Sequence, residues 1–364
     1  MNKRVIYTPG PTDVRENVRN ARATITTNPD LDENFVEFYK ELCDKIASIM
    51  KTKNDVYILS GEGILGLEAA CASLTEEKDR VLIIDNGIFG KGFGDFVKMY
   101  GGEPVYFSQD YERAIDVEKL EEFLKEDNNF KYATIVHCDT PTGVLNPINK
   151  ICPILKSYGI LTVVDTVAAF GGENIEVDEW KIDIAIGGSQ KAISAPSGLT
   201  IVSVSEKAKE SIKNRKSKVV GFYCNLLIWE KYYNEKWFPY TMPISDINGL
   251  DVAINNILEE GIEEVLKRHE AIAKITKTWA SENSLELYLE NGYSNTVTAI
   301  KIPDSIGALK LKEHLLEKYN LMISTSLEQY KDKLIRIGHM GENARLEKIT
   351  YVLDIISKGI KDLS

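Results

Sequence analysis

A lysine and an aspartate, each placed where a predicted strand ends, form a pair that could carry out imine chemistry. The run Ile182–Ile186 breaks into two glycines before Lys191, and the run Leu161–Val164 ends in Asp165. Open α/β sheets bind ligands beyond the carboxyl ends of their strands, so both side chains should face one crevice. Alone, Lys191 would more often be a solvated turn residue. Together, the amine could hold an aldehyde carbon and the carboxylate could keep a pyridine nitrogen protonated. The pair therefore predicts pyridoxal 5′-phosphate as cofactor.

A glycine-rich turn upstream could hold the phosphate of that cofactor. The predicted strand Asp55–Leu59 runs into Ser60–Gly66, and a helix rich in alanine and leucine follows. Such a turn aims free N–H groups and the positive end of the helix dipole at an anion. A tight turn without a ligand is the plain alternative, so the phosphate interpretation depends on Lys191 and Asp165.

Three further segments could border the same crevice. Phe89, in the loop Asn86–Gly92, could stack on a flat ring or anchor its loop in the core. The segment Cys138–Val144 could form a polar rim or a turn capped by its own side chains. The arm Thr8–Thr12, stiffened by two prolines, could cross the mouth of the crevice or lie on the surface.

Seven predicted strands, separated mostly by helices, would position these residues. This alternation is typical of a largely parallel sheet with both faces covered. The last strand follows Ile186 too soon for a helical crossover of roughly 10–12 residues, so it should run antiparallel. The expected strands are Asp55–Leu59, Arg80–Ile84, Pro104–Phe107, Tyr132–His137, Leu161–Asp165, Ile182–Ile186 and Gly198–Ser203. Expected helices include Asn34–Lys51, Val117–Glu126, Pro153–Tyr158 and two stretches within Phe222–Tyr233.

The remaining chain is predicted to form a smaller α+β domain. A long helix, Ile247–Ala280 with a break at Gly261, leads into a strand, a helix, a strand and a helix. We therefore predict an N-terminal arm near the active site (residues 1–20), a large cofactor-binding domain (21–245) and a small C-terminal domain (246–364). Arg336, inside the apolar strand Leu334–Gly338, would be an exposed edge-strand charge or a bidentate clamp for a carboxylate.

Composition narrows the class of protein. The chain has 364 residues, is 43% hydrophobic and 27% charged, and carries a formal net charge of −11, which argues against a nucleic-acid surface. Its five cysteines are odd in number and never in CxxC spacing, and its four histidines form no metal-binding pattern. No stretch approaches the roughly 18 apolar residues of a membrane span. We predict a soluble protein of the reducing cytoplasm, without metal.

The motifs around these residues, taken together and in order, resemble the class V aminotransferases. The branch that handles alanine and glyoxylate, serine and pyruvate, or 2-aminoethylphosphonate and pyruvate is the most similar. The resemblance implies a fold-type I homodimer with its active site at the subunit interface, acting on small amino and keto acids. The motifs that carry it are Thr8–Pro11, Asn86–Gly90, Thr140–Gly143, Val164–Val167 and Ser189–Ala192.

The resemblance also implies a role for each matched residue. Lys191 would form the Schiff base with the cofactor and then move the proton, and Asp165 would pair with the ring nitrogen. Phe89 and Val167 would pack on opposite faces of the ring. The remaining implied contacts are Thr142 beside the ring, Glu62, Gly63, Ile64, Gln190 and Thr241 of the partner subunit at the phosphate, and Arg336 at the substrate carboxylate.

The chain departs from the family at the phosphate turn and near the substrate. Glu62 and Ile64 stand where relatives usually have hydroxyl or imidazole side chains, so an acid lies near an expected dianion. Phe238 replaces a tyrosine of some relatives, and residues 28–30 replace a His-Arg pair. Either Glu62 points away and only backbone donors serve, or the phosphate cup is rebuilt.

The leading hypothesis is a ping-pong transaminase that moves an amino group from alanine, serine or 2-aminoethylphosphonate to pyruvate or glyoxylate. A lyase of the cysteine desulfurase type would need a mobile cysteine near the cofactor, and it commonly has a histidine where Gln190 stands; Cys224 lies in an apolar stretch. A cofactor-free binding relative is the third alternative, motivated by the unusual phosphate turn. The presence of both Lys191 and Asp165 favours the enzyme.

Overall fold

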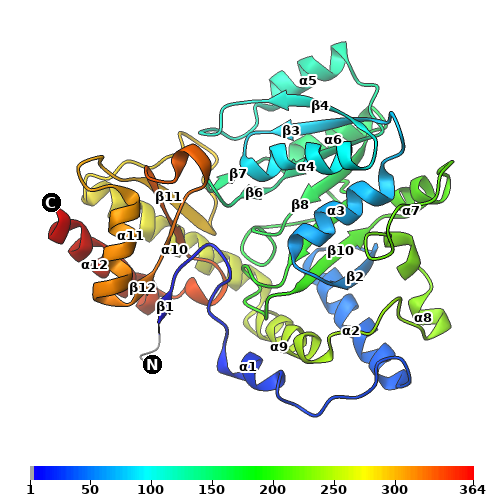
Figure 1. Ribbon diagram of the computed structural model, residues 1–364, viewed down its shortest axis with the longest axis horizontal. Helices are drawn as coiled ribbons and strands as arrows, with labels where there is room; N and C mark the ends of the chain where they lie inside the picture. The colour runs from blue at the N-terminus through cyan, green and yellow to red at the C-terminus, as the bar shows by residue number, and fades with distance from the viewer. Residues whose placement is uncertain (1–3) are drawn as a thin grey trace.

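The computed structural model describes residues 4–364 and has a seven-stranded sheet at its centre (Figure 1). The strand order is β2-β10-β9-β8-β5-β3-β4, and only β10 runs antiparallel to its two neighbours. The prediction of a largely parallel sheet with an antiparallel last strand is therefore confirmed. The strands are β2 (Asp55–Ser60), β3 (Arg80–Asp85), β4 (Glu103–Ser108), β5 (Tyr132–Val136), β8 (Leu161–Asp165), β9 (Ile184–Gly188) and β10 (Leu199–Val204).

Helices cover this sheet because its central strands are apolar on both faces. Every residue of β5, β8, β9 and β10 is buried, as expected for strands enclosed by crossover helices. Helix α3 packs on β9 and β10, α4 packs on β3 and β4, and α6 packs on β8. These helices are α2 (Glu33–Ile49), α3 (Gly63–Leu74), α4 (Ile88–Met99), α5 (Val117–Glu126), α6 (Ile148–Ser157) and α7 (Glu206–Lys213).

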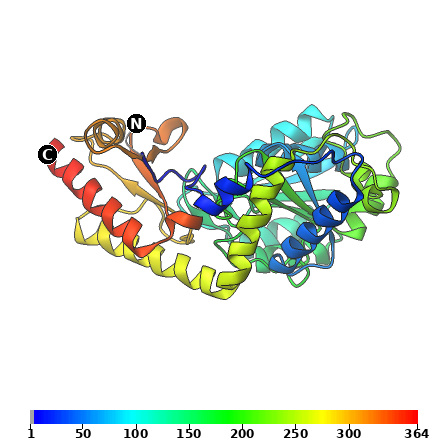
Figure 2. The same ribbon diagram turned by 90° about the horizontal axis from the view of Figure 1, so that it is seen from below.

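A second, smaller body follows the sheet. Helices α9 (Ile244–Glu260) and α10 (Ile262–Glu282) meet at Gly261, whose φ of +85° only glycine adopts easily. Figure 2 shows α10 running along the lower edge of the molecule from the large body to the small one. The apolar core changes over within α10, between Val265 and Ile272. The boundary at residue 246 stays a prediction.

The small body is a three-stranded antiparallel sheet backed by helices. Its strand order is β11-β14-β13, so Arg336 lies on the central strand. Its elements are β11 (Val297–Lys301), α11 (Ala308–Tyr319), β12 (Leu321–Met322), β13 (Ser324–Thr325), η2 (Glu328–Tyr330), β14 (Leu334–Gly338), η3 (Gly341–Asn343) and α12 (Leu346–Leu363).

The start of the chain belongs to both bodies. β1 (Val5–Ile6) pairs in parallel with β12, and Tyr7 is buried in the core of the small body. The chain then crosses to the large body and forms α1 (Glu16–Ala21), which packs on α9. Figure 1 shows this path as the dark-blue ribbon between the two bodies.

Two predicted helical regions differ from the structure. Residues 222–233 contain only the short turn η1 (Leu226–Trp229) and the start of α8 (Tyr232–Glu235). Trp229 and Tyr232 pack on Tyr39, and this aromatic packing fixes an irregular path. Helix α6 begins before Pro153, although proline favours the first turn.

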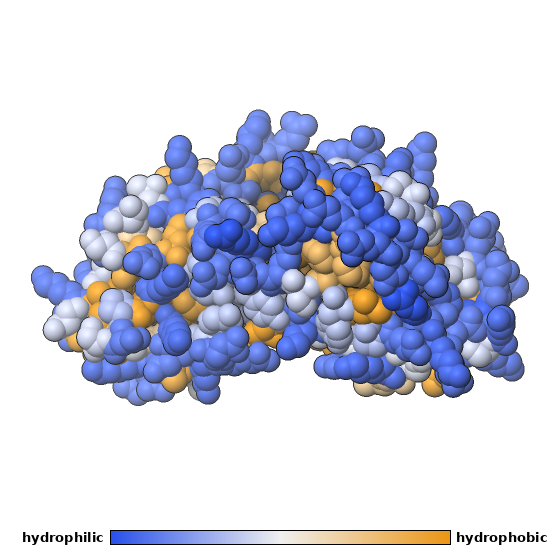
Figure 3. Space-filling view, turned by 90° about the horizontal axis from the view of Figure 1, so that it is seen from above, coloured by the Kyte–Doolittle hydropathy of each residue, from blue (hydrophilic) through white to orange (hydrophobic). Residues whose placement is uncertain are grey.

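The surface is mainly hydrophilic, with separate hydrophobic patches when seen from above (Figure 3). Among residues 4–364, none of the helices has both the length and the apolarity needed to cross a bilayer. Exposed large apolar side chains include Ile25, Leu31, Phe222, Tyr223 and Trp237.

Candidate active site

A cavity of about 350 Å³ lies at the carboxyl ends of β8 and β9. Its walls come from the N-terminal arm, the start of α3, the start of α4 and the segments after β5, β8 and β9. The sequence predictions therefore meet in one place. The predicted residues that line the cavity are Glu62, Gly63, Ile64, Phe89, Asp165, Val167, Gln190 and Lys191.

Asp165 is the last residue of β8 and presents a buried carboxylate to this cavity. Its Oδ1 accepts a hydrogen bond of 2.8 Å from the amide of Val167. Burial raises the pKa of Asp165 to about 7, although the Val167 amide and Lys191 act in the opposite direction. No salt bridge joins this carboxylate to a cation within residues 4–364. A cationic ring N–H in the cavity would supply that missing charge.

Lys191 lies three residues beyond β9 and lines the same cavity. Its Nζ donates a hydrogen bond of 2.6 Å to the carbonyl oxygen of Pro9. The pKa of Lys191 is lowered to about 8, mainly by burial and to a smaller extent by the charge of Arg336, whereas Asp165 acts in the opposite direction. A substantial share of the amine is therefore neutral near pH 8, which is the form that attacks an aldehyde.

Phe89 and Val167 provide apolar walls between these polar groups. The amide of Phe89 donates a 3.0 Å hydrogen bond to Oδ1 of Asp139, which fixes the start of α4. Thr142 does not line the cavity: it is fully buried, and its hydroxyl lies 3.4 Å from both the carbonyl oxygen and Oδ2 of Asp139. Burial also raises the pKa of Asp139 to about 7. Asp139 is not among the predicted site residues, although a second carboxylate after a strand was an available signal in the sequence.

The phosphate end of the cavity is organised around Glu62. Glu62 is the N-cap of α3, and its Oε1 accepts a 3.2 Å hydrogen bond from the amide of Ile64. Its Oε2 accepts a second hydrogen bond of 3.1 Å from the side-chain amide of Gln190. The Oε1 atom of Gln190 is buried without a partner in the described chain. A carboxylate of the protein therefore already holds the helix N-terminus that could bind a phosphate.

Arg336 is buried on the central strand of the small sheet, so the edge-strand interpretation is wrong. Its Nε donates a hydrogen bond of 2.9 Å to the carbonyl oxygen of Thr325, and its Nη1 donates one of 3.1 Å to the carbonyl oxygen of Thr140. No carboxylate from residues 4–364 lies within salt-bridge distance of its guanidinium. A buried arginine with spare donors and no acidic partner suits an external anion.

The arginine faces a separate hollow of about 540 Å³ that adjoins the cavity. Thr8 lines this hollow, whereas Gly10, two residues later, lines the Lys191 cavity. Thr140 connects the two sites as well, because it lines the cavity and its carbonyl holds Arg336. The N-terminal arm therefore lies across the active-site region and not on the outer surface.

Thr241, which the resemblance places at the phosphate of the partner subunit's site, and Phe238 both lie outside the cavity of their own chain. Thr241 is exposed, and its hydroxyl lies 3.2 Å from Oδ2 of Asp30, outside the cavity. Phe238 is buried against Tyr39. Cys224, the thiol considered for a lyase, does not line the cavity, whereas Cys138 does.

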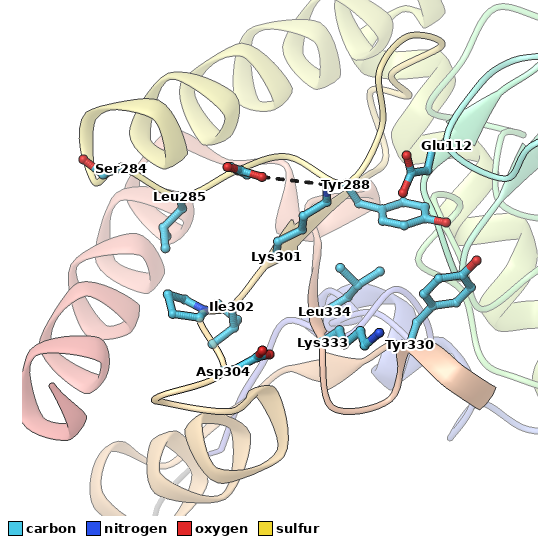
Figure 4. Close-up of a pocket in the computed structure, with 12 residues that line it drawn as sticks. Glu112, Ser284, Leu285, Tyr288, Lys301, Ile302, Asp304, Tyr330, Lys333 and Leu334 are labelled. Carbon is cyan, nitrogen blue, oxygen red and sulfur yellow. Dashed lines mark ion pairs between the residues drawn. The ribbon is translucent and has the colours of Figure 1, made fainter.

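A third hollow, between the small sheet and Glu112, lacks this set of groups (Figure 4). The rings of Tyr288 and Tyr330 lie 5.2 Å apart at one end, and Lys301 forms a 3.8 Å ion pair with Glu286. Neither Lys191 nor Asp165 lines it. The cavity at the strand ends therefore stays the candidate site.

The donor set of that cavity fits the ring of pyridoxal 5′-phosphate better than its phosphate. An amine, a carboxylate without a cationic partner and two apolar walls match the aldehyde, the pyridine nitrogen and the faces of the ring. At the other end, the acid Glu62 occupies the N-cap of α3. A dianion there must displace that carboxylate or lie beside it.

Comparisons with known proteins identify the family of this chain. The family model described as "Aminotransferase class-V" matches residues 12–328. An uncharacterized aminotransferase of Methanocaldococcus jannaschii is 37% identical over 99% of this chain and 94% of the relative. The pyridoxamine–pyruvate transaminase of Mesorhizobium japonicum is 35% identical over 87% of this chain and 81% of the relative. The solved ureidoglycine–glyoxylate aminotransferase of Bacillus subtilis superposes with a TM-score of 0.96 at 28% identity, covering 100% of this chain and 94% of the other.

Proposed function

We propose, because this chain belongs to the class V aminotransferase family, that it moves an amino group from a small amino donor to pyruvate or glyoxylate with pyridoxal 5′-phosphate. One observation carries the proposal: Lys191 and Asp165 face one cavity. Beside it lies Arg336, which has no acidic partner among residues 4–364. An imine lysine, a ring-nitrogen acid and a carboxylate clamp are the groups that transamination requires.

Each side chain has a separate task. The cofactor, when bound, supplies the electron sink that stabilises negative charge at the substrate α-carbon. Asp165 holds a proton on the ring nitrogen. Lys191 takes the proton from the substrate α-carbon and delivers it to the C4′ carbon of the cofactor. Arg336 binds the substrate carboxylate and so fixes the position of the reacting carbon.

The candidate donors are alanine, serine and 2-aminoethylphosphonate. The visible spectrum of the cofactor-loaded protein, recorded with each donor separately, tests them. A donor that removes the absorption band of the bound cofactor, with recovery on adding pyruvate or glyoxylate, is the substrate. Lys191→Ala is the control. A band that no donor shifts would reject this donor set.

A second candidate function is transamination in which free pyridoxamine is the amino donor and pyruvate the acceptor. The Mesorhizobium relative is named for that reaction. The specific observation in favour is Glu62, which holds the amide of Ile64 and the side chain of Gln190. A phosphate at this position would meet a carboxylate, whereas the hydroxymethyl group of pyridoxamine could donate a hydrogen bond to it.

The two candidates differ in which form of the ring compound binds. Titration of the cofactor-free protein with pyridoxal and with pyridoxal 5′-phosphate, followed by borohydride reduction and mass spectrometry of Lys191, measures the preference. Tighter capture of pyridoxal, reversed by Glu62→Ser but not by Glu62→Gln, would favour the second function. Tighter capture of the phosphate form by the unaltered protein would reject it.

We also infer that the protein works as a homodimer. Phe222, Tyr223 and Trp237 are each half exposed within one segment of the large body, and Thr241 lies in the same segment. Exposed aromatic side chains that cluster in this way are typical of interfaces. Sedimentation of the unaltered protein and of Trp237→Asp tests the inference; a monomer in both would contradict it.

A cytoplasmic location is our interpretation of the cysteines. All five are free thiols, and four of them are buried. Burial raises the pKa of Cys138 and Cys71 to about 12, so these thiols are unreactive. Fractionation of the native cells tests the location.

A further inference from the structure

The arm of residues 5–12 is fastened to the small body at one end and to the Lys191 segment at the other. The amide of Tyr7 donates a hydrogen bond of 2.8 Å to the carbonyl oxygen of Met322, and its carbonyl oxygen accepts one of 3.0 Å from the amide of Gly338. At the other end, the amide of Thr12 donates a hydrogen bond of 3.1 Å to the carbonyl oxygen of Gln190. The hydroxyl of Thr12 donates one of 3.0 Å to the carbonyl oxygen of Lys191. The stretch between these anchors has little freedom to move independently.

That stretch is shaped around the lysine side chain. Pro9 offers its carbonyl oxygen to Nζ of Lys191 at 2.6 Å. Gly10 has a φ of +95°, and a Cβ there would lie 2.4 Å from Cδ and 2.8 Å from Nζ of Lys191. Glycine is therefore required for both its backbone conformation and its lack of a side chain. The backbone reaches the lysine as closely as it does only because of this residue.

We propose that the carbonyl of Pro9 is the holding position of the Lys191 amine, from which the lysine reacts and to which it returns. The proposal rests on the function assigned to Lys191 above. The carbonyl accepts one N–H from the amine in either charge state and exchanges no proton with it. In the neutral amine, the lone pair and the second N–H stay free for the cavity. The arm thus orients the amine without using up its reactive electron pair.

Other groups around Lys191 set its charge but not its position. Asp165 comes from the end of β8, Arg336 from β14 and Glu62 from the N-cap of α3, and each acts on Lys191 through its charge. The thiol of Cys138, from the strand after β5, also lies near Lys191, but burial raises its pKa to about 12 and keeps it neutral. None of them makes a hydrogen bond to Nζ within the described chain, whereas Pro9 does. We therefore treat the Pro9 carbonyl as a positioning group.

The test measures the pKa of Lys191 in the cofactor-free protein, through the pH dependence of its reductive methylation by formaldehyde. Gly10→Ala should push the amine off the carbonyl and lower this pKa by about half to one unit, because a carbonyl stabilises an ammonium more than an amine. Gly221→Ala is the matched control, since its φ is +90° and no atom lies within 4 Å of the added Cβ. An equal or higher pKa in Gly10→Ala would overturn the proposal.

A second variant covers the case in which Gly10→Ala does not fold. Thr12→Val keeps the shape of the side chain but removes its hydrogen bond to the Lys191 carbonyl, so it loosens the arm. A smaller decrease in the same pKa would support the proposal, and an unchanged pKa would contradict it. The readout needs no cofactor and no turnover. A failed transamination assay would therefore reject the proposed function and leave this result standing.

Discussion

The two ends of the cofactor cavity are built on opposite principles. At the reacting end, Asp165 and Arg336 are buried and have no ionic partner among residues 4–364, and burial lowers the pKa of Lys191. At the other end, Glu62 satisfies the amide of Ile64 and the side chain of Gln190. A ligand with a cationic and an anionic group would neutralise the buried charges at the reacting end. At the other end, the protein's own carboxylate, Glu62, already accepts the hydrogen bonds that a phosphate could accept. The chain has the lysine, aspartate and arginine that the family resemblance implies, whereas Glu62 lies at the position implied for the phosphate.

The largest expected effect breaks the reacting end outright. Lys191→Ala should abolish borohydride-stable capture of pyridoxal or its phosphate and reduce transamination by roughly 10⁴-fold, because both the imine and the proton carrier are lost. In the unaltered protein, the capture rate should rise with pH, with its midpoint at about pH 8, and level off at higher pH, where the amine is mostly neutral. Mass spectrometry after reduction measures both. Undiminished capture by the variant would place the imine on another lysine.

Asp165→Asn should separate activity from stability. Transamination should fall by about 10³-fold, because an amide cannot keep the ring nitrogen protonated. The cofactor-free variant should nevertheless be more stable than the parent above pH 7. Burial raises the pKa of Asp165 from 3.8 to about 7, so the folded parent loses stability as pH rises through this range. We expect a gain of about 1–4 kcal/mol at pH 8 that shrinks towards pH 4.

Denaturant unfolding of both cofactor-free proteins at pH 5 and pH 8 measures that gain. A gain of equal size at both pH values would show that packing, and not the charge of Asp165, causes it.

Arg336→Lys should give an effect of intermediate size. A lysine keeps the charge but cannot hold two carbonyls and grip a carboxylate in one plane, so KM for a carboxylate donor should rise by roughly 10–100-fold. The value of kcat should change less, because the reacting groups lie in the cavity next to it. Steady-state kinetics with the best donor provides the comparison. An equal rise in KM for an amine donor without a carboxylate would show that Arg336 does not bind the carboxylate of the donor.

The smallest effect comes from the other end. Glu62→Ala removes the N-cap of α3 and should cost about 0.5–1 kcal/mol, whereas Glu62→Ser, which keeps a capping oxygen, should cost less. Thermal unfolding of the cofactor-free proteins measures this difference. A larger loss in both variants would mean that the contact with Gln190, and not the cap, stabilises this corner.

Much of the sheet could be predicted from the sequence because its signals are local. Leu161–Asp165 is a short apolar run and forms β8 with the predicted bounds. The strand predicted at Ile182–Ile186 lies two residues later, at Ile184–Gly188, so the two glycines expected to stop it belong to it. The short connection before β10 determined the direction of β10. Lys191 and Asp165 met as expected because the geometry of parallel strands brings consecutive carboxyl ends together.

What the sequence could not predict depends on distant contacts. The cap formed by Glu62 was missed because glutamate is not among the preferred N-cap residues, and Gln190, its partner, follows another strand. The contact of Pro9 with Lys191 involves a backbone carbonyl, which leaves no mark in residue type. Residues 222–233 carry helical spacing, but aromatic packing on Tyr39 overrides it.

The pairing of β1 with β12 has a consequence for biosynthesis. Val5 and Ile6 are translated well before their partners Leu321 and Met322, by roughly 15–60 s at ordinary rates of synthesis. During that interval the large body can form its sheet and Thr12 can bind the Lys191 segment, but the arm lacks its second anchor, in which Tyr7 bonds to Met322 and Gly338. The nascent chain thus has a lysine and an aspartate in place long before the reactive site is assembled. Full reactivity therefore requires that β12 has been translated and has paired with β1.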